Sequence, residues 1–278
     1  MTGKLLFLDL DGTVWDWHGV IPESAAKTLK KLRENGHLPI ICSGRSKGHI
    51  PCEMLYDMGF AGLVAACGNH VEIGSEILYE RFISHEDILD IIRLSKQYHV
   101  PIVLEGPKYH LLAQEGFVND EFVDRMIKEL GTCALTLDDY TNDIAINKFA
   151  GDILKCSDYT TFKNALKDRI SFIDHGTSYN DYDGEITDPY YVMSVFECVL
   201  YGSSKADGII RMCNHFGIDP KDAFAVGDSN NDLEMIDCVG TGIAMGNGSP
   251  AIKEAADFVT DSLEDDGLQN AMKHFGLI

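Results

Sequence analysis

Short apolar runs and amphipathic stretches alternate at both ends of the chain. The runs are continuous, as is typical of strands buried on both faces of a parallel sheet. They cover Lys4–Leu8, Leu38–Cys42, Leu63–Ala66, Ala223–Val226, Gly242–Met245 and Phe258–Thr260. Between them, helical spacing predicts helices over Glu23–Asn35, Arg45–Met58, Lys205–Phe216 and Asn231–Asp237. This order predicts an α/β fold whose core is a doubly wound parallel sheet.

The middle of the chain has elements of its own. Helices are predicted over Glu86–Gln97 and Asp120–Leu130, and strands over Ile102–Leu104 and Ile144–Phe149. The alternation of strands and helices that is predicted at both ends of the chain stops before this stretch and resumes after it. The sequence therefore predicts a core domain of residues 1–83 and 189–278, with an inserted α/β domain of residues 84–188.

Composition limits the partners of this chain. Its 278 residues, 45% of them hydrophobic, can bury a large core. The formal charge of −21 repels nucleic acid and anionic membranes, and no apolar run is long enough to span a bilayer. The eight cysteines lack the paired spacing of a zinc or dithiol site, and no secretion signal is evident. We expect a cytoplasmic protein that binds neither nucleic acid nor membrane.

Two aspartates at the end of the first predicted strand are the strongest candidates for chemistry. Ligands of open parallel sheets bind beyond the carboxyl ends of the strands, which is where Asp9 and Asp11 lie. Because the two carboxylates point in different directions, one can stay ionised while the other holds a proton. Asp9 can then attack phosphorus while Asp11 protonates the leaving oxygen. Gly12 and Thr13 would shape the turn around the phosphate.

A carboxylate that attacks a phosphate dianion needs a cation to screen the repulsion, and Mg²⁺ prefers oxygen ligands. The predicted ligands are the Asp9 carboxylate, the Asp11 backbone carbonyl and the Asp228 carboxylate. Asp232 would not touch the metal but would orient one of its ligands or Lys205. The phosphate would be bound by three further groups. These are the Ser43 hydroxyl, the N–H groups around Gly44 at a predicted helix start, and the Lys205 ammonium.

Each motif alone also has a simpler explanation. Asp-Gly-Thr after a strand is usually an ordinary turn, and the stretch from Asp228 to Asp232 can be a helix cap. Lys205 alone would be a solvated lysine, and Arg45 is as readily a surface ion pair as a substrate contact. We therefore leave Arg45 out of the predicted site. Only the order of the motifs along the chain favours function.

Four motifs, in that order, resemble those of the haloacid dehalogenase (HAD) superfamily. They are Asp9-Leu10-Asp11-Gly12-Thr13, Ser43-Gly44-Arg45, Lys205, and Gly227-Asp228-Ser229-Asn230-Asn231-Asp232. The segments Ile243–Asn247 and Asp265–Gly267 narrow the resemblance to Cof-like phosphatases, related to sugar phosphatases. That group carries a C2-type α/β cap between the second and third motifs. One departure is His70, which follows Asn69 where the group usually has glycine.

The resemblance implies a Rossmann-like core and assigns a role to each matching residue. Asp9 is the nucleophile, Asp11 the acid and base, Ser43 and Lys205 bind phosphate, Asp228 binds the metal, and Asn231 contacts phosphate or substrate. Over the inserted domain the match rests mainly on length and placement. Among its residues, His110 and His175 are more readily core or surface residues than substrate contacts.

We therefore expect a magnesium-dependent phosphatase that hydrolyses small phosphorylated metabolites, sugar phosphates first, through an aspartyl phosphate. A phosphotransferase or phosphomutase using the same intermediate stays open as an alternative. So does a non-catalytic phospholigand-binding protein, although such a protein has no need of both Asp9 and Asp11. We expect a monomer or a small homo-oligomer.

Overall fold

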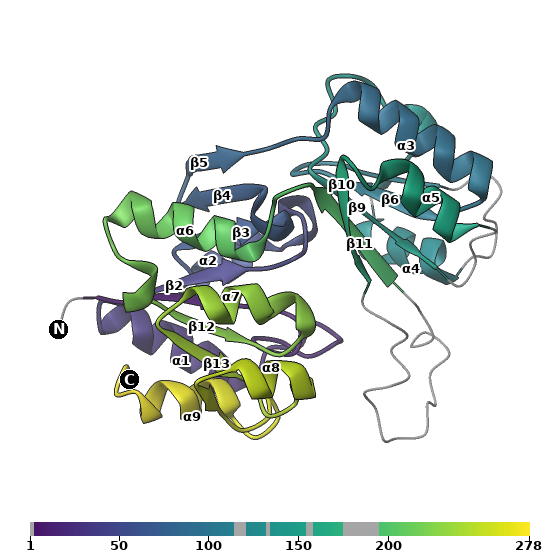
Figure 1. Cartoon of the computed structure of the whole chain (residues 1–278). Coiled ribbons are helices and arrows are strands. Elements are labelled where there is room, and N and C mark those ends of the chain that lie inside the picture. Colours follow the sequence, from purple (N-terminus) through teal and green to yellow (C-terminus); the bar gives the residue numbers. More distant parts are fainter. Residues whose placement is uncertain (1–2, 114–120, 132–133, 154–157, 175–194) are drawn as a thin grey trace. The chain divides into compact units, whose positions relative to one another are not determined.

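A computed structural model describes residues 3–113, 121–131, 134–153, 158–174 and 195–278 (Figure 1). The chain forms two compact units, each of which is described by itself. The first comprises Met1–Arg45, Pro51–Glu80 and Ser204–Ile278, and the second comprises Ser46–Ile50 and Arg81–Ser203. The predicted boundary at residues 188 and 189 falls outside the described residues, and so does His175.

The first unit is built on an eight-stranded sheet in the order β14-β13-β12-β1-β2-β3-β4-β5. Its strands are β1 (Leu5–Leu8), β2 (Leu38–Cys42), β3 (Gly62–Ala65), β4 (His70–Ile73), β5 (Glu76–Glu80), β12 (Phe224–Gly227), β13 (Thr241–Ala244) and β14 (Phe258–Val259). The strands from β14 to β3 are parallel, while β4 and β5 continue the sheet antiparallel. The predicted doubly wound parallel sheet is confirmed.

Helices cover both faces of this sheet. They are α1 (Glu23–Glu34), α2 (Cys52–Asp57), α6 (Lys205–Phe216), α7 (Leu233–Cys238), α8 (Pro250–Ala255) and α9 (Gly267–His274). Leu5 and Phe7 of β1 join a buried cluster that contains Ile209 and Met212 of α6. The alternate residues Leu6 and Leu8 are also fully buried. Because both faces of β1 are covered, its sequence is apolar at every position.

The predicted helix over Arg45–Met58 is wrong, because a proline interrupts it. The structure has a short 3₁₀ helix, η1 (Lys47–His49), followed by α2, which begins after Pro51. Ile50, the residue before the proline, is extended, with φ −111° and ψ 126°. A proline ring clashes with the preceding residue in helical conformation, so one continuous helix cannot form here.

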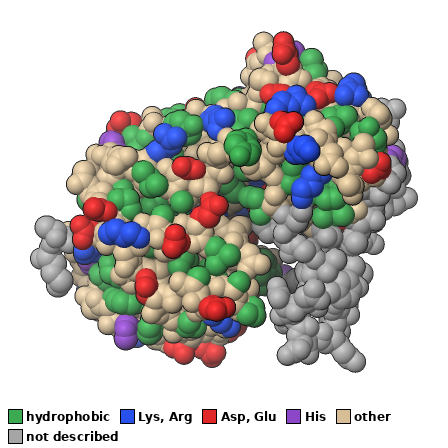
Figure 2. All heavy atoms as spheres, viewed as in Figure 1, with side chains coloured by type: hydrophobic (Ala, Val, Ile, Leu, Met, Phe, Trp, Pro, Cys, Tyr) green, Lys and Arg blue, Asp and Glu red, His purple; other side chains and the backbone are tan. Residues whose placement is uncertain are grey.

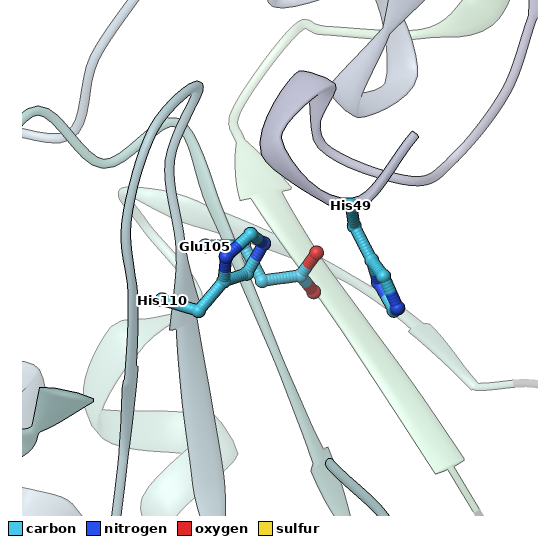
Figure 3. A group of neighbouring side chains, drawn as sticks. All are labelled: His49, Glu105 and His110. Carbon is cyan, nitrogen blue, oxygen red and sulfur yellow. The ribbon is translucent and has the colours of Figure 1, made fainter. Parts of the chain in front are cut away.

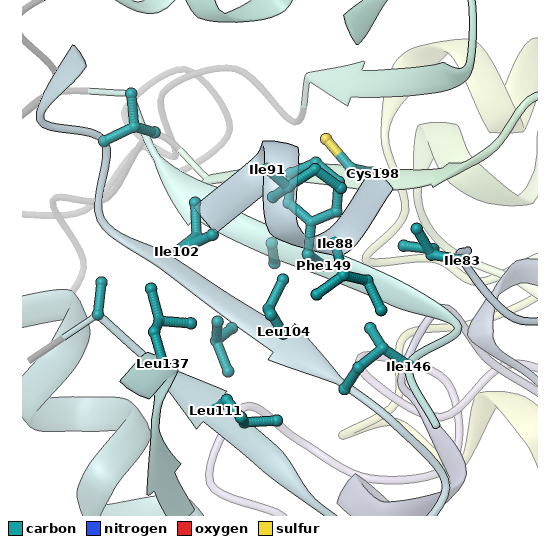
Figure 4. Close-up of a cluster of buried hydrophobic side chains, with 14 of the residues drawn as sticks. Ile83, Ile88, Ile91, Ile102, Leu104, Leu111, Leu137, Ile146, Phe149 and Cys198 are labelled. Atoms are coloured by element: carbon teal, nitrogen blue, oxygen red, sulfur yellow. The ribbon is translucent and has the colours of Figure 1, made fainter. Parts of the chain in front are cut away.

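The second unit is a six-stranded sheet in the order β10-β11-β9-β6-β7-β8. Its elements are α3 (His85–Tyr98), β6 (Ile102–Glu105), β7 (His110–Leu112), α4 (Glu121–Leu130), β8 (Ala134–Thr136), β9 (Lys148–Asp152), α5 (Tyr159–Leu166), β10 (Ile170–Asp174) and β11 (Val195–Leu200). The strand predicted over Ile144–Phe149 is shifted to β9, since Ile146 is buried but lies in the preceding loop. A separate apolar core, with Leu104 and Phe149 among its residues, lies in this unit (Figure 4).

The surface agrees with the acidic composition. Figure 2 shows acidic side chains spread over the visible face among hydrophobic and basic ones. Within the described ranges, no helix is both long and apolar enough to cross a membrane.

Candidate active site

The candidate site lies where the direction of strand order reverses. β1 has β2 on one side and β12 on the other, so the chain builds the sheet outward from β1 in both directions. Asp9 directly follows β1, and its N–H donates to Val226 of β12 at 3.0 Å. Asp228 directly follows β12. Such a reversal opens a crevice at the carboxyl ends of the strands, and it brings Asp9 and Asp228 to the same edge.

A buried ammonium joins two of the aspartates. Lys205 Nζ lies 2.7 Å from Asp9 Oδ1 and 2.5 Å from Asp232 Oδ1. Asp9 is 5% exposed, Lys205 2% and Asp232 0%. Charges so deeply buried are tolerated only when they are paired, so Lys205 neutralises part of the carboxylate charge in the site.

Two glycines let α6 bring Lys205 this close. A Cβ on Gly68, whose φ is +85°, would lie 2.1 Å from the carbonyl oxygen of Ser204. A Cβ on Gly208 would lie 2.3 Å from Val64 Cγ1 in β3. The start of α6 therefore packs directly against the end of β3 and its following turn, which points Lys205 toward Asp9.

The Asp228 carboxylate packs closely against the turn that follows β1. A Cβ on Gly12 would lie 2.3 Å from Asp228 Oδ2, so only glycine fits beneath this carboxylate. Asp232 Oδ2 accepts the backbone N–H groups of Asp228 and Ser229, each at 3.1 Å. Both oxygens of Asp232 are thus engaged, whereas Asp228 Oδ1 has no hydrogen-bond partner among the described residues.

This donor set suits a hard divalent cation. Oxygens of Asp9, Asp228 and Asp232 lie within 4.8 Å of one another. Three buried carboxylates face one ammonium, which leaves excess negative charge for a cation to neutralise. Magnesium takes carboxylate oxygens together with water and substrate oxygens, so the residues present fit Mg²⁺.

Two of these buried carboxylates, those of Asp9 and Asp228, have raised pKa values. Burial and the charge of Asp232 raise the pKa of Asp9 to about 8, although Lys205 opposes the shift. Burial and the charges of Asp9 and Asp232 raise the pKa of Asp228 to about 9. Binding of a cation favours the ionised forms and therefore has to displace protons from these groups near neutral pH.

Asp11 lies in a different environment. Arg45 donates to both its oxygens, from Nε to Oδ2 and from Nη2 to Oδ1, each at 2.8 Å. Trp15 Nε1 donates to Oδ1 at 2.9 Å. Burial acts to raise the pKa of Asp11, but the Arg45 charge and these hydrogen bonds outweigh it and lower the pKa. The two aspartates of the motif therefore shift in opposite directions: the pKa of Asp9 is raised, and the pKa of Asp11 is lowered.

Of the other predicted residues, Ser43 and Asn231 have local hydrogen-bond partners, whereas the Thr13 hydroxyl has none among the described residues. Ser43 is 1% exposed, and its hydroxyl accepts the Arg45 N–H at 3.2 Å beside Gly44. Asn231 is half-buried, and its Oδ1 accepts the Ser229 hydroxyl at 2.6 Å. Thr13 is fully buried, but its hydroxyl has no hydrogen-bond partner among the described residues. Backbone hydrogen bonds, not this hydroxyl, secure the turn after β1.

Three residues that contact the Asp9–Thr13 motif or its backbone were not among the predicted site residues. Arg45 was recognised but left out, because an exposed ion pair explained it equally well. Asn247, within the quoted segment Ile243–Asn247, donates from Nδ2 to the Gly12 carbonyl at 2.8 Å. Trp15 is 4% exposed, and no pattern in the sequence indicated its contact with Asp11.

His70, the departure from the family pattern, is also fully buried. Its ring nitrogens lie 2.8 Å from carboxylate oxygens on either side, Nδ1 from Glu80 and Nε2 from Glu72. Tyr56 donates to the other Glu72 oxygen at 2.6 Å. The histidine therefore joins β4 and β5 through side-chain hydrogen bonds that glycine cannot make.

Known proteins resemble this chain along nearly its whole length. The model of the haloacid dehalogenase-like hydrolases matches residues 6–272. YkrA of Bacillus subtilis is 28% identical over 280 residues, covering 100% of both chains. The 5-amino-6-(5-phospho-D-ribitylamino)uracil phosphatase YitU of that bacterium is 25% identical and covers 98% of this chain and 97% of its own. Among solved structures, the HAD subclass IIB sugar phosphatase BT4131 shares the fold, with a TM-score of 0.78 at 22% identity, covering 99% of this chain and 100% of its own.

Proposed function

This chain belongs to the haloacid dehalogenase-like hydrolases, and on that premise we propose that it is a magnesium-dependent phosphatase of small phosphorylated metabolites. The observation that carries the proposal is the geometry around Asp9. That carboxylate is buried, contacts Lys205 at 2.7 Å, and lies within 4.8 Å of oxygens of Asp228 and Asp232. A nucleophile placed beside an ammonium and a cation site is suited to attack a phosphate group.

The proposed reaction has two steps. In the first, Asp9 attacks phosphorus, an aspartyl phosphate forms, and the bond to the leaving oxygen breaks while Asp11 supplies a proton to that oxygen. In the second, Asp11 takes a proton from water, which attacks phosphorus and releases inorganic phosphate from Asp9. The Arg45 ion pair keeps Asp11 ionised, which is the form needed in the second step. Donation in the first step requires that this pair loosens.

The remaining residues bind and orient. Lys205 and the Ser43 hydroxyl, with backbone N–H groups around Gly44, would neutralise and position the phosphate oxygens, and Asn231 would contact phosphate or substrate. Asp9, the Asp11 carbonyl and Asp228 would hold Mg²⁺, with Asp232 fixing the Asp228 backbone and Lys205. The bound cation would screen the repulsion between nucleophile and phosphate.

The second unit would select the leaving group, as a cap does. We propose phosphate esters of sugars and sugar alcohols as substrates, because YitU, by its name, acts on a phosphorylated ribityl chain. Nothing in the chemistry at Asp9 distinguishes one leaving alcohol from another, so substrate choice belongs to residues outside the first unit's motifs.

The test is a screen of sugar and sugar-alcohol phosphates with the purified chain, measuring inorganic phosphate. We expect release with Mg²⁺ and a loss of roughly two orders of magnitude or more with a chelator, restored by added Mg²⁺, because the bound cation would stabilise the transition state by several kcal/mol. Phosphate that migrates within the sugar would instead indicate a mutase. Binding without turnover of any ester would indicate a phospholigand sensor.

Replacing the general acid and base tests the two-step scheme. In Asp11→Asn, phosphoenzyme breakdown should slow by about 10²- to 10⁴-fold, because general base catalysis of water attack is lost. With an activated ester such as p-nitrophenyl phosphate, whose leaving group needs little protonation, a burst of alcohol should precede slow turnover. Mass spectrometry of the intact protein should then detect one added phosphoryl group.

The matched control is Asp57→Asn, which changes an exposed aspartate of α2. It should turn over at the wild-type rate. If Asp11→Asn also hydrolysed esters at the wild-type rate, another group would have to move the proton.

A further inference from the structure

Three adjacent strands of the sheet in the second unit carry ionisable side chains side by side at one level of the sheet. In the strand register, Glu105 of β6 lies opposite His110 of β7 and Lys148 of β9. All three are buried, with exposures of 4%, 0% and 1%. Burying such groups opposes folding unless each is paired or binds a ligand, so every polar atom of this row should have a partner.

A second histidine approaches this row from the other segment of the same unit. His49, at the end of η1, belongs with Ser46–Ile50 to the second unit. Side-chain atoms of His49, Glu105 and His110 that can bind a metal all lie within 4.8 Å of one another. Figure 3 shows the Glu105 carboxylate between the two imidazole rings. The three groups converge from three separate elements.

Two of these residues keep an unsatisfied atom that is buried. His110 Nδ1 and Glu105 Oε2 have no hydrogen-bond partner within the described part of the chain. Their other polar atoms are engaged: His110 Nε2 lies 2.9 Å from the Ser46 hydroxyl, and Glu105 Oε1 lies 3.4 Å from Lys148 Nζ. When Nε2 donates to Ser46, Nδ1 presents a lone pair. A second hydrogen bond of this kind is how metal-binding histidines are oriented.

The backbone is shaped to allow this approach. A Cβ on Gly48 would lie 2.8 Å from the Gly106 carbonyl oxygen and 2.9 Å from His110 Cε1. Any other residue would push η1 away from the β6–β7 hairpin and carry His49 with it. The neighbouring Gly106 is equally confined, since its Cβ would lie 2.0 Å from the Ala145 carbonyl oxygen.

The local charge favours a cation. Lys148 Nζ also pairs with Glu197 at 2.5 Å, so two carboxylates face one ammonium.

We propose that His49, Glu105 and His110 form a binding site for a divalent transition-metal ion, separate from the aspartate site of the first unit. Two imidazoles and one carboxylate match the donor preference of Zn²⁺, which takes three protein ligands when a fourth position is left for water or another ligand. His49 is half-buried, which leaves the ion an approach from solvent. The ion would fasten η1 to the β6–β7 hairpin.

The test titrates Zn²⁺ into the full chain, in excess Mg²⁺, against a chromophoric zinc indicator. His49→Gln is the main variant, because a half-buried side chain can be changed with little effect on folding. We expect it to weaken one Zn²⁺ site by at least about tenfold, since one of three ligands is lost. Glu105→Gln, which keeps the shape but removes the charge, should weaken the same site. Bound Co²⁺ should give visible absorption bands that both variants lose.

His85→Gln is the control, because His85 is an exposed histidine of the same unit. It should bind Zn²⁺ as the wild type does, and Asp228→Asn should retain the histidine site. The proposal is overturned if His49→Gln and Glu105→Gln, shown by circular dichroism to be folded, bind Zn²⁺ with the stoichiometry and affinity of the wild type. Absence of Zn²⁺ binding by Asp228→Asn would overturn it as well.

Discussion

Replacing Asp9 by asparagine should abolish phosphate release, lowering kcat by roughly four orders of magnitude or more, because an amide cannot form the covalent intermediate. The fold should survive. Asparagine can still accept the hydrogen bond from Lys205, and it cannot acquire the charge that burial and Asp232 disfavour when they raise the pKa of Asp9 to about 8. The melting temperature should therefore be unchanged or slightly higher than that of the wild type.

The measurement is phosphate release from the best ester of the screen, with intact-protein mass spectrometry during turnover. Asp57→Asn is again the control, since it is the same chemical change at an exposed position. Near wild-type release by Asp9→Asn, or a phosphoryl group attached to another side chain, would reject Asp9 as nucleophile. Loss of activity together with loss of folding would point to a structural role instead.

Replacing Lys205 by methionine should cost both activity and stability. The ammonium lies between Asp9 and Asp232, and without it buried carboxylates remain with no cation. Removing one partner of a buried ion pair typically destabilises by about 3 to 5 kcal/mol. The rate should fall by roughly two to three orders of magnitude, because a group that neutralises the transferring phosphate is lost.

The stability loss should depend on pH. A carboxyl whose pKa is higher in the folded than in the unfolded state contributes stability at low pH, and that contribution is lost as pH rises through the folded-state value. Asp9 already has such a raised pKa, about 8, and losing Lys205 removes a group that lowers it. Lys205→Met should therefore be less destabilised near pH 5 than near pH 8, and added Mg²⁺ should recover part of the difference.

Tryptophan fluorescence can follow the unfolding of the first unit. The chain has two tryptophans, Trp15 and Trp17, and both belong to the first unit, so their signal reports the unit that contains Lys205. Lys27→Met is the matched control, because its ion pair with Glu23 is exposed to solvent and should contribute little to stability. Equal stability loss in the two variants at pH 8 would contradict the assigned role of Lys205.

The core of the fold could be predicted from the sequence because its strands are buried on both faces. β1 and β2 are apolar at nearly every position, and the α6 bounds were predicted without error. The β4–β5 hairpin was not predicted, since His70 occupies a buried position there with glutamate partners. A polar residue in a core hides the pattern on which strand prediction depends.

The site was predictable to the extent that its residues lie on motifs at strand ends. Asp9 and Asp228 follow β1 and β12, and the strand order brings them together. The Arg45–Asp11 pair was not predictable, because an ion pair depends on side-chain direction after a turn, which sequence spacing does not determine. The same holds for His49, which meets Glu105 only because Gly48 allows the contact.

The position of β1 between β2 and β12 also sets a constraint during synthesis. Asp9 and Asp228 are about 220 residues apart along the chain, so at ribosomal rates roughly 11 to 44 s pass between their appearance. Throughout that interval β1 lacks one of its two neighbours and presents an open, apolar strand edge. The nascent chain therefore lacks the complete aspartate site and is prone to aggregation until β12 emerges, and any truncated product that ends before β12 is expected to require a chaperone or degradation.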